Sequence, residues 1–204
     1  MTLSVAITAP TAQPLRGGGS LLEKLRSATA EQHRQLEETV EITRRVSDRE
    51  SYRQLLEKFY GFYAPIERQL VGTAAAKYEV MRGRFNKSRW LAQDLAQLGV
   101  SDVAQLPQLC ALPPVDTPAR VLGTMYVLEG STLGGRHITA LLNAGRAADL
   151  PKRFFSSYGS EVGSMWRSFC AALDELTDPA DHGTAAENAC ATFESMRVWL
   201  REQS

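Results

Sequence analysis

The sequence predicts an all-α fold, a single-domain bundle of several helices. The chain has 204 residues, of which 44% are hydrophobic, enough to enclose one sizeable core. Apolar residues recur at intervals of three and four over several long stretches, as they do on the buried face of a helix. No segment shows the strict alternation of a half-buried strand. Because helical bundles place ligand sites between facing helices, we expect any site of this chain there.

Residues 1–19 are predicted to form a flexible leader. They contain Pro10, Pro14 and a run of three glycines, a composition that buries too little apolar surface to order itself. They lack the basic start and continuous apolar core of a signal peptide, and no apolar run in the chain is long enough to span a membrane. We therefore expect one ordered domain over residues 20–204, located in the cytoplasm.

The first two long helices are predicted from capping patterns that precede apolar residues at helical spacing. Residues 20–23, Ser-Leu-Leu-Glu, have the spacing of a capping box, in which the serine and glutamate side chains accept hydrogen bonds from free amides at a helix start. A helix is therefore expected to begin near Leu21. Residues 47–50 repeat the Ser-x-x-Glu spacing, and the apolar residues from Tyr52 to Ile66 predict the second helix.

A third long helix is predicted in the second half of the chain. The paired prolines within residues 112–116 predict a loop, because proline supplies no N–H to a helix. Thr117 and Pro118 then suit the N-cap and the first helical position, and the helical pattern extends to about Asn143.

Four shorter helices complete the predicted bundle. Helical patterns cover residues 73–85 and 88–98 before the loop, and residues 159–176 and 185–202 near the end of the chain. The last of these is opened by Thr184 and Glu187, which have the spacing of a further capping box.

Composition argues against several classes of function. The 23 lysines and arginines equal the 23 aspartates and glutamates, so no net field favours nucleic acid or an anionic membrane, and a small partner is expected. Cys110, Cys170 and Cys190 lack CxxC, CxxCH and zinc-finger spacings, which predicts reduced cysteines. No GxGxxG fingerprint follows a strand, so no built-in flavin or nicotinamide domain is expected.

His33 is the best-placed candidate metal ligand. The chain has only three histidines, and His33 stands one helical turn before Glu37, so both side chains lie on one helix face. Glu37 then accepts a hydrogen bond from Nδ1–H and leaves Nε2 free for a metal, an arrangement common among ligating histidines. The alternative is an ordinary surface pair of histidine and glutamate, and spacing alone leaves both interpretations open.

Three glycines interrupt the third long helix. Gly130, Gly134 and Gly135 each cost roughly 1 kcal/mol relative to alanine, so a purely structural helix is not expected to retain them. Gly130 and Gly134 lie one turn apart on one face, where bare main chain lets a flat ligand approach and the helix bend. Close packing between two helices is the alternative, and it remains open.

These two segments resemble two helices of the haem oxygenase family. Residues 25–33, Leu-Arg-Ser-Ala-Thr-Ala-Glu-Gln-His, together with Glu37, resemble the proximal helix of that family. Residues 126–135, Tyr-Val-Leu-Glu-Gly-Ser-Thr-Leu-Gly-Gly, resemble its distal helix. Order and separation also fit, and the resemblance covers roughly residues 20–202. It implies an all-helical bundle that holds haem between these two helices.

The resemblance implies a role for several residues at the haem. His33 corresponds to the axial iron ligand, Glu37 to its neighbour and Thr29 to a residue beside the proximal face. Gly130 and Gly134 correspond to the positions where the distal helix crosses the haem.

The haem propionates require partners at the pocket rim. Arg26 resembles a basic position of the proximal helix and lies seven residues before His33, on the same helix face. Tyr126, Gly135 and Arg167 are looser matches as cofactor-binding residues. Arg26, Tyr126 and Arg167 are otherwise explained as amphipathic side chains that pack their stems and expose their tips.

Ser131 departs from the mammalian pattern of the family. An aspartate normally stands there and organises water beside bound O2, and some bacterial members also lack it. The Ser131 hydroxyl is able to hold water, but the group that orders the proton relay stays open. His137 lies two turns beyond Gly130 and is a second candidate near this side, with an exposed or packed histidine as the alternative.

The resemblance implies that haem is cofactor and substrate together. O2 binds opposite His33, and the products of the family are biliverdin, CO and ferrous iron. The missing CxxCH motif means that haem binds without a thioether. An external electron donor is required, so a reductase or ferredoxin is an expected transient partner. Iron acquisition, haem turnover and supply of a bilin to a photoreceptor remain open as roles.

Two rival functions remain. A thiaminase-like enzyme on a similar helical scaffold needs a nucleophile and a base, and Cys170 and Cys190 have no histidine near them in sequence. A non-catalytic haem carrier needs the same iron ligand as an oxygenase, so the sequence does not separate these two.

Overall fold

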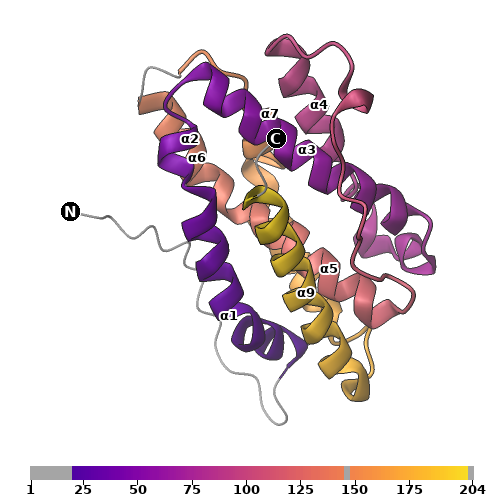
Figure 1. Ribbon diagram of the computed structural model, residues 1–204. Helices are drawn as coiled ribbons and strands as arrows, with labels where there is room; N and C mark the ends of the chain where they lie inside the picture. Colours follow the sequence, from indigo (N-terminus) through magenta and orange to yellow (C-terminus); the bar gives the residue numbers. More distant parts are fainter. Residues whose placement is uncertain (1–19, 145–147, 202–204) are drawn as a thin grey trace.

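The computed structural model describes residues 20–144 and 148–201, and every regular element in these ranges is a helix (Figure 1). The predicted all-α class is therefore confirmed. The predicted leader, residues 1–19, lies outside the described residues. The α-helices are α1 (Leu21–Val40), α2 (Ile42–Arg45), α3 (Arg49–Val71), α4 (Lys87–Gln97), α5 (Pro118–Gly130), α6 (Gly135–Ala144), α7 (Arg153–Ser156), α8 (Val162–Leu173) and α9 (His182–Arg201).

Short 3-10 turns connect several of these helices. Over the described ranges, no helix is both long and apolar enough to cross a bilayer. The turns are η1 (Ala74–Lys77), η2 (Glu79–Met81), η3 (Val103–Gln105), η4 (Ser131–Gly134), η5 (Gly159–Glu161) and η6 (Pro179–Asp181).

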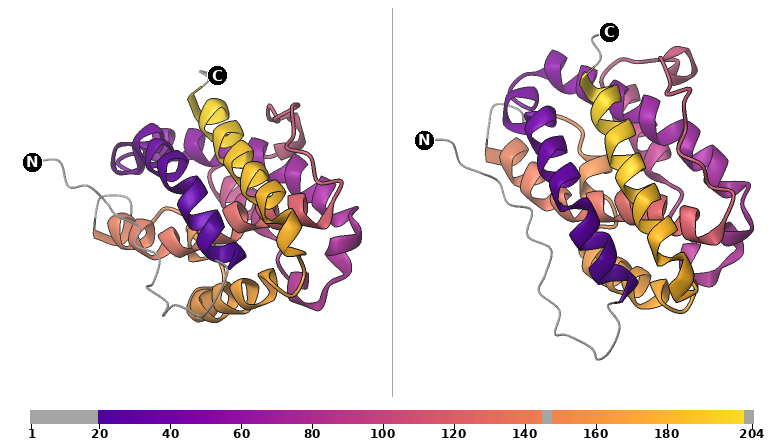
Figure 2. Two further views of the ribbon diagram at one scale, coloured as in Figure 1. Left: turned by 90° about the horizontal axis from the view of Figure 1, so that it is seen from below. Right: turned by 60° about the horizontal axis from the view of Figure 1, so that its bottom comes forward.

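The centre of the bundle is built around α9. Helix α1 runs beside α9, and α5 packs against α9 as well (Figures 1 and 2). The approach of α5 is close because residue 123 is glycine: a Cβ there would stand 2.3 Å from the carbonyl oxygen of Ala185. Helices α3 and α4 pack against each other in a second pair. Apolar side chains from all five helices form one continuous core.

The capping box at the start of α1 is confirmed. The Glu23 amide donates to Ser20 Oγ over 3.2 Å, and the Ser20 amide donates to Glu23 Oε2 over 3.1 Å. The Leu21 amide donates to Oδ1 of Asp174, which follows α8, over 2.7 Å. The first free amides of α1 are therefore satisfied by both local and distant acceptors.

The two other predicted capping boxes are wrong. Asp48, not Ser47, caps α3 and accepts from the Ser51 amide, because its carboxylate stands one residue closer to the helix. The Ser47 hydroxyl instead donates to the carbonyl of Arg44. Thr184 lies inside α9, which begins at His182 because η6 leads directly into it.

The predicted helix over residues 73–85 is also wrong. That segment forms the two 3-10 turns η1 and η2 and then turns at Gly83, whose φ of 75° breaks helical geometry. The prediction over residues 88–98 is confirmed by α4. Residues 159–176 contain the shorter helix α8.

The third long helix is broken at the predicted glycines. Thr117 caps α5 by accepting from the Arg120 amide, and Pro118 is its first residue, as predicted. The helix ends at Gly130, η4 follows, and α6 resumes at Gly135. The glycine segment is therefore a break between two helices, flanked by regular helix on both sides.

Candidate functional site

Helix α1 presents His33 and Glu37 on one face, as the four-residue spacing predicts. The His33 imidazole is 40% exposed, and its ring packs edge-on against Phe193 of α9, with 5.7 Å between ring centroids. Nδ1 lies 3.7 Å from Glu37 Oε1, an electrostatic contact longer than a hydrogen bond. Among the described residues, no hydrogen bond reaches either ring nitrogen, so Nε2 is available to a ligand.

Close packing explains why residue 135 is glycine but not why residue 130 is. A Cβ on Gly135 would stand 2.0 Å from the carbonyl oxygen of Phe155, so the approach of α6 to α7 requires glycine at this position. A Cβ on Gly130 would meet the Trp166 ring at 3.8 Å, an ordinary van der Waals contact. Gly134 is buried in η4. Close packing therefore accounts for Gly135, whose contact with a cofactor stays a prediction, and leaves Gly130 without a packing reason.

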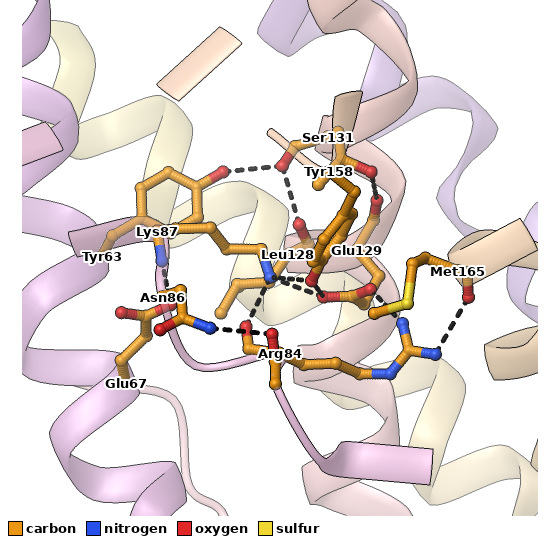
Figure 3. A network of polar contacts seen from close by, with 12 residues as sticks. Tyr63, Glu67, Arg84, Asn86, Lys87, Leu128, Glu129, Ser131, Tyr158 and Met165 are labelled. Carbon is orange, nitrogen blue, oxygen red and sulfur yellow. Dashed lines mark hydrogen bonds and ion pairs between the residues drawn. The ribbon is translucent and has the colours of Figure 1, made fainter. Parts of the chain in front are cut away.

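Ser131 is held by a tyrosine that sequence reasoning missed. Tyr63 of α3 donates to Ser131 Oγ over 2.8 Å, and Ser131 Oγ donates to the carbonyl of Leu128 over 2.8 Å (Figure 3). Burial raises the pKa of Tyr63, so this phenol is a neutral donor. In the sequence, Tyr63 is one of several aromatic residues on the apolar face of a helix, and nothing in that pattern names Ser131 as its partner.

Two predicted rim residues, Arg26 and Tyr126, lie together with Thr29 between α1 and α5. Burial raises the pKa of Tyr126, while the nearby Thr29 hydroxyl and the charge of Arg26 act in the opposite direction. Cys170 of α8 joins this group, and Arg26 lowers its pKa against the larger effect of burial. Arg26 Nε is buried and, among the described residues, has no hydrogen-bond partner. A buried guanidinium N–H of this kind favours an anionic acceptor.

Arg167 does not join this group in the described contacts. It is exposed on α8, and its Nη1 lies 3.2 Å from the position of a Cβ on Gly163 of the same helix. Its role toward a propionate remains a prediction.

The two other histidines lie elsewhere. His137 is exposed on α6. His182 is buried at the first residue of α9, where Nε2 stands 3.9 Å from Asp174 Oδ1 near the start of α1. His33 is therefore the one histidine that shares α1 with Thr29 and Arg26.

A buried ionic cluster lies directly beside the turn between α5 and α6. Glu129, the residue before Gly130, pairs with Arg84 and Lys87, and Tyr158 donates to it over 2.9 Å (Figure 3). Sequence reasoning missed these residues because charged side chains are usually exposed, and no local pattern marks these as buried.

A family comparison identifies the class of protein. The family model described as "Heme oxygenase" matches residues 19–202. The chain belongs to the haem oxygenase family. It is therefore an oxidoreductase that acts on haem, as the resemblance of the two helices predicts.

A curated haem oxygenase supports this assignment. The protein from Xanthomonas campestris pv. campestris (strain 8004) is 28% identical over 162 residues, covering 77% of this chain and 93% of the relative.

Solved haem oxygenases have the same fold. The NO- and CO-bound enzyme of Neisseria meningitidis has a TM-score of 0.73 at 20% identity, covering 89% of this chain and 90% of that one. Haem oxygenase-1 of the cyanobacterium Synechocystis sp. PCC6803, in complex with haem, has a TM-score of 0.71 at 18% identity, with coverage of 89% and 91%. The Leptospira interrogans enzyme scores 0.72 at 18% identity, with coverage of 91% and 100%.

The residues of this site fit a haem. His33 offers an imidazole without a hydrogen-bond partner among the described residues, and Arg26 offers a buried N–H in the same condition. Gly130 has no side chain at a position where packing does not demand its absence, since a Cβ there would make only ordinary contact with Trp166. A neutral nitrogen donor, a cation for a carboxylate and a glycine that packing does not require match the iron, a propionate and the flat ring.

Proposed function

We propose that this chain cleaves haem to biliverdin, CO and ferrous iron, using O2 and electrons from a separate donor. The observation that carries the proposal is the pairing of an imidazole at His33 that has no hydrogen-bond partner among the described residues with a glycine at position 130 that packing does not require. Thr29 and Tyr126 lie in contact, and each stands four residues before one of these two positions. His33 and Gly130 are therefore each about 6 Å along their helices from that contact.

On the proximal side, His33 binds the iron through Nε2. Glu37 stands near Nδ1 and stabilises the ring orientation in which that nitrogen carries its proton. Bound haem supplies the iron that holds O2 and the porphyrin ring that is oxidised. Phe193 limits rotation of the imidazole through its edge contact.

At the rim, Arg26 and Tyr126 bind the propionates. Arg26 supplies a charge-assisted hydrogen bond from a guanidinium whose Nε is otherwise unsatisfied. The Tyr126 hydroxyl lies close to Thr29, on the helix that also carries Arg26. Their place between α1 and α5 orients the ring within the pocket.

On the distal side, Gly130 and Gly134 bring bare main chain against the ring face. Ser131 takes the place of the aspartate found in mammalian members, and its hydroxyl orders a water molecule there. Tyr63 fixes that hydroxyl by donating to it, and the raised pKa keeps Tyr63 protonated during turnover. Because the Ser131 proton is already donated to the Leu128 carbonyl, its oxygen accepts from that water, and the water supplies the proton that the reaction consumes.

The partners of the reaction are a reductase or ferredoxin in the cytoplasm. A bilin-accepting photoreceptor is a candidate recipient of the product. A cysteine-dependent hydrolase on this scaffold is disfavoured, because burial raises the pKa of Cys170 to about 11 and also raises that of Cys190. Such thiols are weak nucleophiles at neutral pH.

A hemin titration of the apoprotein tests the proposal. We expect saturable one-to-one binding with an imidazole-ligated spectrum, abolished by His33→Ala and retained by His137→Ala, a matched change at an exposed histidine. Addition of reductant and O2 is then expected to bleach the Soret band and release a bilin. A Soret band that persists through many reductant additions would identify a carrier instead.

A further inference from the structure

Three charged side chains are buried together next to η4, the turn that the proposed function places on the distal side of the haem. Arg84, Lys87 and Glu129 are exposed to 2%, 1% and 1% respectively. Arg84 Nη1 donates to Glu129 Oε2 and Lys87 Nζ donates to Oε1, so each carboxylate oxygen has its own cation (Figure 3). Arg84 lies in the segment that leads into α4 and Lys87 is the first residue of α4, whereas Glu129 is the second-last residue of α5.

The remaining donors of the cluster are also satisfied. Lys87 Nζ donates to the Arg84 carbonyl over 2.8 Å, and Arg84 Nη2 donates to the Met165 carbonyl and to Ser168 Oγ, each over 2.9 Å. Tyr158 adds a third donor to the Glu129 carboxylate. The cluster therefore joins α5, the start of α4 and the segment before it, the residue before η5, and α8.

Charge balance in this region involves a second buried glutamate. Glu67 accepts from the amides of Lys87 and Ser88 and from the Ser88 hydroxyl. The two buried cations thus have two buried carboxylates beside them. A satisfied network of this kind specifies geometry, since a shift of any member leaves a charge unpaired in a low-dielectric interior.

The main chain beside Glu129 holds the turn that follows. The Glu129 carbonyl accepts from the Thr132 hydroxyl over 2.7 Å, and the Leu128 carbonyl accepts from Ser131 Oγ. Glu129 is therefore fixed by its side chain on one side and bound to η4 through its backbone on the other. Any displacement of its carboxylate is transmitted to Ser131 and Gly130 through these short links.

Backbone strain supports the same cluster. Ser157 has φ of 45° and ψ of −118°, a conformation that glycine adopts far more readily than serine, and it is buried. It directly precedes Tyr158, the phenol that donates to Glu129. Strain of this kind persists where surrounding contacts hold the chain, and here it orients a donor into the cluster.

We infer that Glu129 is a positioning residue, whose clamped carboxylate sets the place of Ser131 and the bare Gly130 main chain over the haem and so selects the meso carbon that is attacked. This inference rests on the proposed function, in which the turn covers the haem. Stability alone does not explain the cluster, because apolar residues of similar volume stabilise a core as well as a buried ion pair does. The need to hold one backbone geometry beside the ring that reacts does explain the cluster.

Glu129→Gln is the primary test, since it keeps the shape and removes the charge. Two measurements are made: hydrogen exchange of the apoprotein amides of residues 131–135, and the ratio of bilin isomers separated by chromatography. We expect exchange at least about tenfold faster in the variant. We also expect a changed isomer ratio with hemin affinity within about threefold of wild type, because His33 and Arg26 are untouched.

Two further variants separate positioning from stability. Asn188→Leu removes hydrogen bonds to the Arg120 carbonyl and Thr124 Oγ1 at the far end of α5, and it is expected to lower stability without altering the isomer ratio. Glu129→Asp keeps the charge with a shorter side chain and is expected to fall between wild type and Glu129→Gln. If Glu129→Gln does not fold, the double variant with Lys87→Met removes one unpaired cation and takes its place in both measurements.

The results distinguish failure of this inference from failure of the proposed function. Wild-type isomer ratios together with wild-type exchange at residues 131–135 in Glu129→Gln would overturn the inference. An isomer shift of equal size in Asn188→Leu would also overturn it, because general destabilisation would then suffice. If wild-type protein releases no bilin, the proposed function fails, and the exchange measurement on apoprotein still decides whether Glu129 holds the turn.

Discussion

The Tyr63 hydroxyl donates to Ser131 Oγ over 2.8 Å and so joins α3 to the turn that follows Gly130. The two residues are 68 positions apart in sequence. The bond gives η4 a neutral donor supplied by a helix of the core.

Tyr63→Phe removes this donor while it preserves the ring. Loss of one neutral hydrogen bond costs about 1 kcal/mol, which corresponds to roughly fivefold slower bilin formation because the bond contributes in the transition state and not in the resting haem complex. Single-turnover rates from the haem complex check this. Tyr60→Phe on the same helix is the matched control, and an equal slowing there would remove Tyr63 from the distal side.

The glycines at 130 and 135 are expected to respond differently to alanine. Gly135→Ala places a Cβ against the Phe155 carbonyl and should lower the free energy of unfolding by about 2 kcal/mol. Gly130→Ala meets only ordinary contact and should raise stability by up to about 1 kcal/mol through helix propensity. Urea denaturation measures both, and hemin turnover should suffer in Gly130→Ala despite its stability. A stable, fully active Gly130→Ala would count against a role of that position at the haem.

Arg26→Gln is expected to weaken hemin binding. It removes a charge whose buried Nε has no acceptor among the described residues, and loss of one charge-assisted hydrogen bond should raise the Kd roughly tenfold. Arg167→Gln, at an exposed position on α8, is the comparison and should raise the Kd by less than Arg26→Gln, because an exposed pair is weaker than a buried one. The opposite ranking of the two variants would transfer the propionate contact to Arg167.

Ser157→Gly should stabilise the protein. Glycine relieves the positive φ and removes a buried hydroxyl without a hydrogen-bond partner among the described residues, which together exceed the entropy cost of glycine by about 1 kcal/mol. Ser156→Gly, within α7, should instead destabilise. Thermal unfolding of the two variants should move Tm in opposite directions, and a decrease in both would show that residue 157 is not strained.

Alkaline conditions should unfold the protein as tyrosines ionise. Burial raises the pKa of Tyr52, Tyr63 and Tyr158 in the folded chain, so unfolding favours their ionisation. Their contribution to stability is complete below the ordinary tyrosine pKa of about 10 and is lost as pH rises above it. Phenolate absorbance and circular dichroism should therefore change together, and phenolate formation by these residues in folded protein would contradict this.

Much of the fold was predictable from local pattern. The apolar spacing that predicts α1, α3, α5 and α9 reports burial of one face, and burial is what forms these helices. Capping patterns were less decisive, because a nearby competitor can take the position, as Asp48 did from Ser47.

The site was predictable only in part. His33 and Glu37 lie on one helix, so their spacing alone predicts that they are neighbours. Only the resemblance to a known family predicts that Gly130 faces them across a haem. The contacts of Glu129 with Lys87 and Arg84 span 42 and 45 positions, and they depend on which helices pack against each other. Periodicity does not carry that information, since it shows which face is buried and not what covers it.

The hydrogen bonds at the first turn of α1 have a practical consequence. The amides of Ser20, Leu21 and Glu23 donate to side-chain oxygens of Glu23, Asp174 and Ser20, respectively. All of these residues lie within the part of the chain that the structure describes. A shortened protein that starts a few residues before Ser20 keeps each of these bonds, and with them the support of the helix that carries His33.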